Sequence, residues 1–196
     1  MRWERRSRWQ VLALILGALV FGAPSLVHAS NASRQTEEGP ETAFESVMEK
    51  MAAQHYMEAR SLCNSILKKY PDYARCYNLL GFYYERIRLD FDKAFNYYMK
   101  AMKLGFFKAY VNFGRLAIDL ARLQSEKGLS EKEASRTIIA ASLLIEGALK
   151  LRATNPDYDT SSMESDIEVA RRFLEPLAEA GNAEALDTLQ RYFPSD

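Results

Sequence analysis

The chain has 196 residues, and its 26 Lys and Arg residues balance 26 Asp and Glu residues, so the formal net charge is zero. Nucleic-acid-binding proteins usually carry a basic excess, and this balance argues against that class. Hydrophobic residues make up 48% of the sequence, which is enough to build a core and argues against a disordered chain. The only two histidines, His28 and His55, are too few for a histidine-based metal centre or catalytic triad.

The first 29 residues follow the order of a secretory signal peptide. Four arginines within the first eight residues precede an uncharged apolar run over 11–23, and small residues around Ala29 offer a cleavage site. Pro24 interrupts the apolar run, which leaves it shorter than the roughly 20 residues of a transmembrane helix. We therefore expect a Sec-type signal that is cut after Ala29 and a periplasmic mature protein. The alternative is an uncleaved segment that anchors the protein in the inner membrane.

Residues 30–42 are typical of a flexible spacer, because polar residues, Gly and Pro occur there without apolar periodicity. From residue 43 to the end, apolar residues recur at the three- and four-residue spacing of one helix face. No stretch alternates convincingly with a period of two, so we expect an all-α fold class. The helical domain over 43–196 divides into four expected helix-pair units, at about 43–72, 73–106, 107–153 and 160–196.

A spacing of 11 and then 4 residues recurs along the helical domain. Three sets of residues share it: Ala59, Tyr70 and Ala74; Ala94, Gly105 and Ala109; and Ala170, Gly181 and Ala185. The first members of these sets lie 35 and 76 residues apart, which matches one and two periods of a helix-pair solenoid. Small residues at fixed places allow two antiparallel helices to approach closely. The spacing predicts an α–α superhelix, a right-handed solenoid of antiparallel helix pairs.

A further set of residues carries a family resemblance: Ala74, Leu80, Gly81, Tyr84, Asp92, Lys93, Ala94, Tyr97, Tyr98, Lys100, Ala101, Gly105, Ala109 and Gly114. Together they resemble one Sel-one-like repeat that runs into the next, in a family related to the tetratricopeptide repeats. Residues 170–185 are similar to the second helix and turn of the same family. Residues 69–72 (Lys-Tyr-Pro-Asp) resemble the end of an ordinary tetratricopeptide repeat. The resemblance implies a superhelix and says little about the ligand.

In such a superhelix the first helix of each pair lines the concave groove. The outward positions expected on these helices are Arg75, Asn78, Phe82, Glu85, Lys108, Asn112, Arg115 and Arg122. Basic side chains beside asparagine can hold a carboxylate or a peptide backbone through forked hydrogen bonds. We therefore expect a protein or peptide partner in this groove. The alternative at each position is an ordinary solvated helix face.

The third unit differs from the others. Residues 106–127 predict a long helix, and Ser130 with Glu133 forms a capping-box pattern that starts another helix, which runs to about Arg152. The polar loop expected over 154–162 is either a surface connection or an insertion on the binding face.

Cys63 and Cys76 are thirteen residues apart in neighbouring predicted helices. Export would place them in an oxidising compartment, where the two thiols can form a disulfide. The alternative is a pair of small buried side chains.

The sequence contains no Gly-rich phosphate loop and no nucleophile elbow, so we expect no enzyme activity, no cofactor and no metal site. The expected function is a non-catalytic protein–protein interaction adaptor or scaffold in a bacterial cell envelope. Two alternatives remain open: a cell-wall-active enzyme with a single catalytic carboxylate, and a self-assembling structural module.

Overall fold

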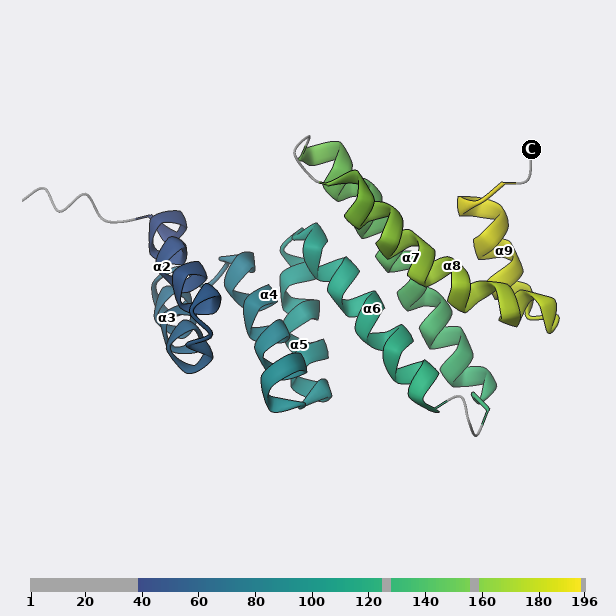
Figure 1. The fold of residues 1–196 in the computed structure, drawn as a ribbon, viewed down its shortest axis with the longest axis horizontal. Coiled ribbons are helices and arrows are strands. Elements are labelled where there is room, and N and C mark those ends of the chain that lie inside the picture. Colours follow the sequence, from purple (N-terminus) through teal and green to yellow (C-terminus); the bar gives the residue numbers. More distant parts are fainter. Residues whose placement is uncertain (1–38, 125–127, 156–158, 195–196) are drawn as a thin grey trace, which may run out of the picture. The chain divides into compact units, whose positions relative to one another are not determined.

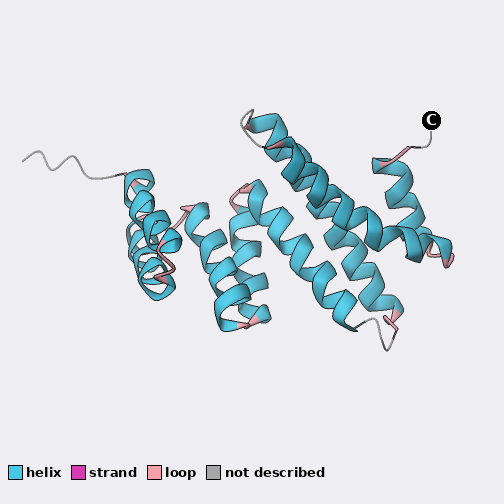
Figure 2. Ribbon diagram, in the orientation of Figure 1, coloured by secondary structure: helices cyan, strands magenta, loops and turns pink. Residues whose placement is uncertain are grey.

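The computed structural model describes residues 39–124, 128–155 and 159–194, which belong to one compact unit, Gly39–Asp196. The signal peptide expected over 1–29 and most of the expected spacer lie outside the described residues. Within the described ranges every regular element is a helix and none is a strand (Figures 1 and 2). The all-α fold class is therefore confirmed.

Eight α-helices and one π-helical turn follow one another in the described part of the chain. They are α2 (Pro40–Ala52), α3 (Tyr56–Lys69), α4 (Ala74–Tyr83), η1 (Tyr84–Arg88), α5 (Phe91–Lys103), α6 (Phe107–Gln124), α7 (Glu131–Thr154), α8 (Thr160–Glu179) and α9 (Ala183–Tyr192). Each α-helix packs against the next one in the chain. Contacts also join α4 with α6, α6 with α8, and α7 with α9, which are next-but-one neighbours in the chain.

Side-chain caps set several helix starts. Ser130 and Glu133 form the expected capping box at the start of α7, with the Ser130 amide donating to Glu133 Oε2 at 2.9 Å. Asp159 caps α8 by accepting hydrogen bonds from the amides of the second and third residues of that helix. Helix α8 therefore begins inside the polar loop expected over 154–162. Helix α2 begins at Pro40, inside the expected spacer, because proline suits the first helical position.

Three helices end in the same kind of turn, in which the backbone passes through a left-handed conformation. The positive φ angles after α2, α5 and α8 are 60° at Gln54, 77° at Gly105 and 88° at Gly181. In each turn the following amide donates to a carbonyl five residues earlier: His55 to Lys50, Phe106 to Ala101, and Asn182 to Leu177. Tyr70, which the repeat spacing aligns with the two glycines, has a φ of −129° and precedes Pro71, so that helix ends differently.

Small residues bring the helices together as the repeat spacing predicts. Five of the six alanines of the pattern are fully buried, and the sixth, Ala74, is partly buried. The five are Ala59, Ala94, Ala109, Ala170 and Ala185. At Gly81 in α4, an added Cβ would lie 2.5 Å from the ring of Tyr98 in α5. At Gly114 in α6, an added Cβ would overlap the backbone of Ala140 and the side chain of Leu144 in α7. These glycines are therefore required for close helix approach.

The buried side chains form three clusters along the described chain, one over α2 to α4, one over α5 and α6, and one over α6 to α9. Cys63 of α3 and Cys76 of α4 belong to the first cluster, and both are fully buried free thiols. The hydrogen bond with Cys76, together with burial, raises the pKa of the Cys63 thiol. The pair thus packs as two small buried side chains, and the disulfide stays a prediction for an oxidising compartment.

Candidate functional site

Two of the residues expected in the groove, Asn78 and Asn112, contact each other. Nδ2 of Asn112 in α6 donates to Oδ1 of Asn78 in α4 at 2.9 Å, and the two residues are 34 positions apart. This separation is close to the 35-residue period of the repeat spacing. The amides connect the first helices of two pairs, which uses part of their hydrogen-bonding capacity within the fold.

Arg115 of α6 contacts a side chain of α8. Its guanidinium forms an ion pair with Asp166 of α8, whose side chain is only 2% exposed. A buried carboxylate without a cation would carry a large desolvation cost, so Arg115 neutralises a charge inside the fold. The Arg115 side chain keeps 40% of its surface exposed, but its charge is not available for an acidic partner.

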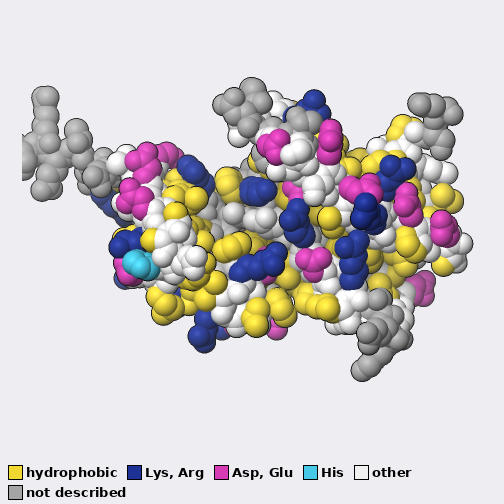
Figure 3. Space-filling view, in the orientation of Figure 1, with side chains coloured by type: hydrophobic (Ala, Val, Ile, Leu, Met, Phe, Trp, Pro, Cys, Tyr) yellow, Lys and Arg dark blue, Asp and Glu magenta, His cyan; other side chains and the backbone are white. Residues whose placement is uncertain are grey.

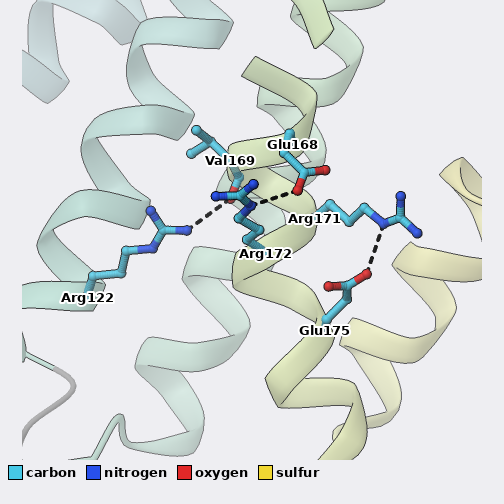
Figure 4. Close-up of polar contacts among 6 residues, drawn as sticks. All are labelled: Arg122, Glu168, Val169, Arg171, Arg172 and Glu175. Carbon is cyan, nitrogen blue, oxygen red and sulfur yellow. Dashed lines mark hydrogen bonds and ion pairs between the residues drawn. The ribbon is translucent and has the colours of Figure 1, made fainter. Parts of the chain in front are cut away.

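Arg122 lies on the same side of α6 as Arg115 and reaches α8, where its Nη2 donates to the carbonyl of Val169 at 3.3 Å (Figure 4). The arginines of α8 beside it form ion pairs along their own helix: Arg171 with Glu175, and Arg172 with Glu168. Figure 3 shows Lys and Arg side chains (dark blue) interleaved with Asp and Glu (magenta) over this region. Exposed pairs of this kind contribute little to stability and leave no concentrated positive charge.

Glu85, in η1, contacts one side chain of α5 and one of η1. The Tyr98 hydroxyl donates to its Oε2 at 2.6 Å, and its Oε1 lies 2.7 Å from Nε of Arg86. Burial, followed by the Glu85 charge, raises the pKa of Tyr98. The Arg75 guanidinium lies 4.5 Å from the ring centroid of Phe44, which belongs to α2. Both of these expected groove residues therefore have partners within the fold.

The remaining two expected groove residues are Phe82, which is 36% exposed, and Lys108, which is half-buried. Three cavities formed by described residues have linings that include none of these eight residues. The structure brings Asn78 and Asn112 together, and it gives Arg115 and Arg122 partners on α8. Binding of a partner protein by the eight residues stays a prediction.

The largest of these cavities is an apolar groove of about 670 Å³ between α5 and α7, with α6 as its floor. Its lining includes Phe95 and Met99 of α5, Phe113, Ala117 and Leu120 of α6, and Ala140 of α7. The groove exists because α6 has 18 residues and α7 has 24, whereas α5 has only 13 and leaves part of α6 uncovered. The sequence did not predict this groove, although it indicated longer helices in the third unit than in the others.

Two properties of the described residues concern metal binding and membrane spanning. Among the described residues, no group of three or more His, Cys, Asp or Glu side chains is arranged to hold a metal ion. None of the described helices combines the length and the apolar character needed to cross a bilayer.

No protein-family model matches the chain, and no curated protein or solved structure matches it either. The resemblance to Sel-one-like and tetratricopeptide repeats therefore rests on the residues that carry it.

Proposed function

We propose that the protein is an exported, non-catalytic adaptor or scaffold of a bacterial cell envelope that binds a segment of a partner protein. The observation that carries the proposal is the apolar groove between α5 and α7. Recognition grooves are concave and mostly apolar, with a few polar groups that fix the orientation of the ligand. The groove has this composition.

The occupant that suits the groove best is an amphipathic helical segment of the partner. Rings and aliphatic side chains from three helices offer an apolar surface, and Phe95 packs edge-on against Phe113 with ring centroids 5.0 Å apart. Glu133 and Arg136 of α7 stand among the lining residues and supply one charge of each sign. A helix with apolar residues at three- and four-residue spacing would fill the groove and place its polar face toward these charges.

The superhelix is part of the same proposal. Contacts between next-but-one helices, the shared turns at Gly105 and Gly181, and the 34-residue separation of Asn78 and Asn112 support a solenoid of helix pairs. The order of basic, apolar and small residues in the first 29 positions supports export. Reading the N-terminus of the chain purified from cells tests cleavage, and a start at Ser30 is expected.

Site-specific photo-crosslinking tests the groove. A photoreactive residue in place of Gln124, an exposed residue of the lining, is expected to capture a partner in the native envelope. The matched control replaces the exposed Gln190 of α9, which does not line the groove. Filling the groove with Ala117→Phe is expected to abolish both the crosslink and binding of the purified partner, whereas Ala153→Phe on the exposed side of α7 leaves both intact. Equal capture from both positions, or binding that survives Ala117→Phe, would refute the proposal.

A further inference from the structure

A second cavity, of about 310 Å³, lies where α3, η1 and the start of α5 meet. Three of its lining side chains are cations, Arg60, Arg88 and Lys93, and one is a carboxylate, Asp90. The chain as a whole is neutral, so this concentration of positive charge is local. It shares no lining residue with the apolar groove.

The single carboxylate of this cavity is already engaged. Asp90 caps α5 and accepts hydrogen bonds from the backbone amide of Lys93 at 3.1 Å and from its Nζ at 2.6 Å. The hydrogen bonds from Lys93 lower the pKa of Asp90, and the nearby charge of Arg88 acts in the same direction. Asp90 therefore balances Lys93, and the charges of Arg60 and Arg88 remain in excess. The positive end of the α5 helix dipole adds to that excess.

Tyrosine rings contact two of the three cations, Arg60 and Lys93. The Arg60 guanidinium lies 5.5 Å from the ring centroid of Tyr83 and 5.9 Å from that of Tyr84. Nζ of Lys93 lies 5.4 Å from the centroid of Tyr84. Contact with an aromatic face restrains a guanidinium without using its N–H donors, so the donors of Arg60 stay available for an incoming oxyanion.

The backbone around Arg88 is unusual. Residues of η1 form a π-helical turn, and Leu89 follows in a left-handed conformation with a φ of 52°. A left-handed residue other than glycine carries strain, and π-helical turns occur frequently at functional sites. Because of this turn, Arg88 and Asp90 both line the cavity, one on each side of Leu89.

The positive charge continues along α5. A third cavity, of about 390 Å³, is lined by Lys93, Lys100 and Lys103 together with uncharged residues. At 1.5 Å per residue, Lys93 and Lys103 are about 15 Å apart along the helix, which matches four to five residues of an extended peptide. Met99 lines both this cavity and the apolar groove, so the basic surface and the groove adjoin.

We propose that Arg60, Arg88, Lys100 and Lys103, which flank the Lys93–Asp90 ion pair, form a basic strip that binds an acidic peptide segment of the partner. One carboxylate is placed between Arg60 and Arg88, where two guanidiniums can donate in pairs to a planar oxyanion. Further acidic side chains at alternate positions of the peptide meet Lys100 and Lys103 of α5. The inference rests on the proposed adaptor function for its biological partner, but the strip itself can be tested with a probe that has no apolar residues.

The probe is a fluorescent, end-blocked peptide in which glutamate alternates with glycine, titrated with the full-length mature protein and followed by fluorescence anisotropy. The same peptide with glutamine in place of glutamate is the uncharged control. The glutamate peptide is expected to bind and the glutamine peptide is not. Binding is expected to weaken as the salt concentration rises from low to physiological, because the contacts are exposed and charged. Equal binding of both peptides would overturn the proposal.

Three variants locate the site. Arg60→Gln and Arg88→Gln are each expected to weaken binding of the glutamate peptide about tenfold, the effect of losing one charge-assisted contact. Arg191→Gln, which removes an exposed arginine of α9 that lines neither basic cavity, is expected to change binding less than about twofold. If Arg60→Gln impairs folding, the exposed Arg88 decides the result. An equal loss in Arg191→Gln and Arg88→Gln would show only general charge attraction and would reject the strip.

Two further measurements separate the neighbouring possibilities. Inorganic pyrophosphate that binds while the glutamate peptide does not would assign the cavity to a phosphate ligand and overturn the proposal. Ala117→Phe, which fills the apolar groove, is expected to leave binding of the glutamate peptide unchanged. Failure of the groove and failure of the strip are therefore distinguishable.

Discussion

Replacing Gly81 by alanine tests whether small residues are what allows α4 and α5 to pack. In the structure the new Cβ would lie 2.5 Å from Cδ1 and Cε1 of the Tyr98 ring. The ring has little room to move, because Tyr98 is fully buried and its hydroxyl is bound to Glu85 at 2.6 Å. The substitution therefore forces the two helices apart or displaces a core side chain.

Two opposing effects decide the size of the change. Alanine in a helix interior is more favourable than glycine by about 1 kcal/mol. Overpacking a core costs about 1–3 kcal/mol, and the rigid ring places this site at the upper end of that range. The net expectation for Gly81→Ala is a loss of about 2 kcal/mol in the free energy of unfolding, or roughly 4–8 °C in Tm for a domain of this size.

Urea and thermal unfolding, followed by far-ultraviolet circular dichroism, measure the effect. A double-mutant cycle with Tyr98→Leu isolates the contact, because removing the ring should make Gly81→Ala neutral or stabilising. A coupling free energy of about 1–3 kcal/mol is expected between the two sites. If Gly81→Ala alone stabilises the protein by the helix-propensity gain, the close approach of the ring is refuted.

Three further predictions concern the backbone, a buried charge and ionisation. Gln54→Gly is expected to raise the free energy of unfolding by about 1 kcal/mol, and Gly105→Ala is expected to lower it by a similar amount, because both positions have a positive φ. Urea unfolding measures both changes. Changes of the same sign in the two variants would contradict the turn geometry. Arg115→Met is expected to lower the free energy of unfolding by about 2 kcal/mol, because the buried Asp166 carboxylate loses its cation, while the partial exposure of the pair limits the loss. Adding Asp166→Asn should recover part of that stability in the same assay, and strictly additive losses would argue against the ion pair. Burial and a neighbouring carboxylate raise the pKa of Tyr98 above its usual value of 10.0, so the stability linked to its protonated hydroxyl is complete below about pH 10 and is lost as the pH rises further. Alkaline unfolding curves should therefore be steeper for the wild type than for Tyr98→Phe, and identical slopes would contradict this linkage.

Much of the local structure follows from short stretches of sequence. Ser130 and Glu133 cap α7 because both partners of the capping box lie within one turn. Gly105 and Gly181 end their helices through the same backbone conformation, which their shared spacing indicated. Gln54 makes the same turn without glycine and was not predicted, because a side chain other than glycine gives no sequence signal for positive φ.

The sequence alone determined that the described chain is helical and where most of its helices begin and end, because periodicity, caps and turns act over a few residues. It also placed Asn78 and Asn112 on outward positions of two helices, and the structure shows that they contact each other. Only the tertiary structure decided that Arg115 reaches Asp166, a residue 51 positions later in the chain, and that the apolar groove lies over α6 between α5 and α7. Such contacts depend on helix lengths and on the side-chain geometry between helices distant in sequence, and no local pattern encodes these distances.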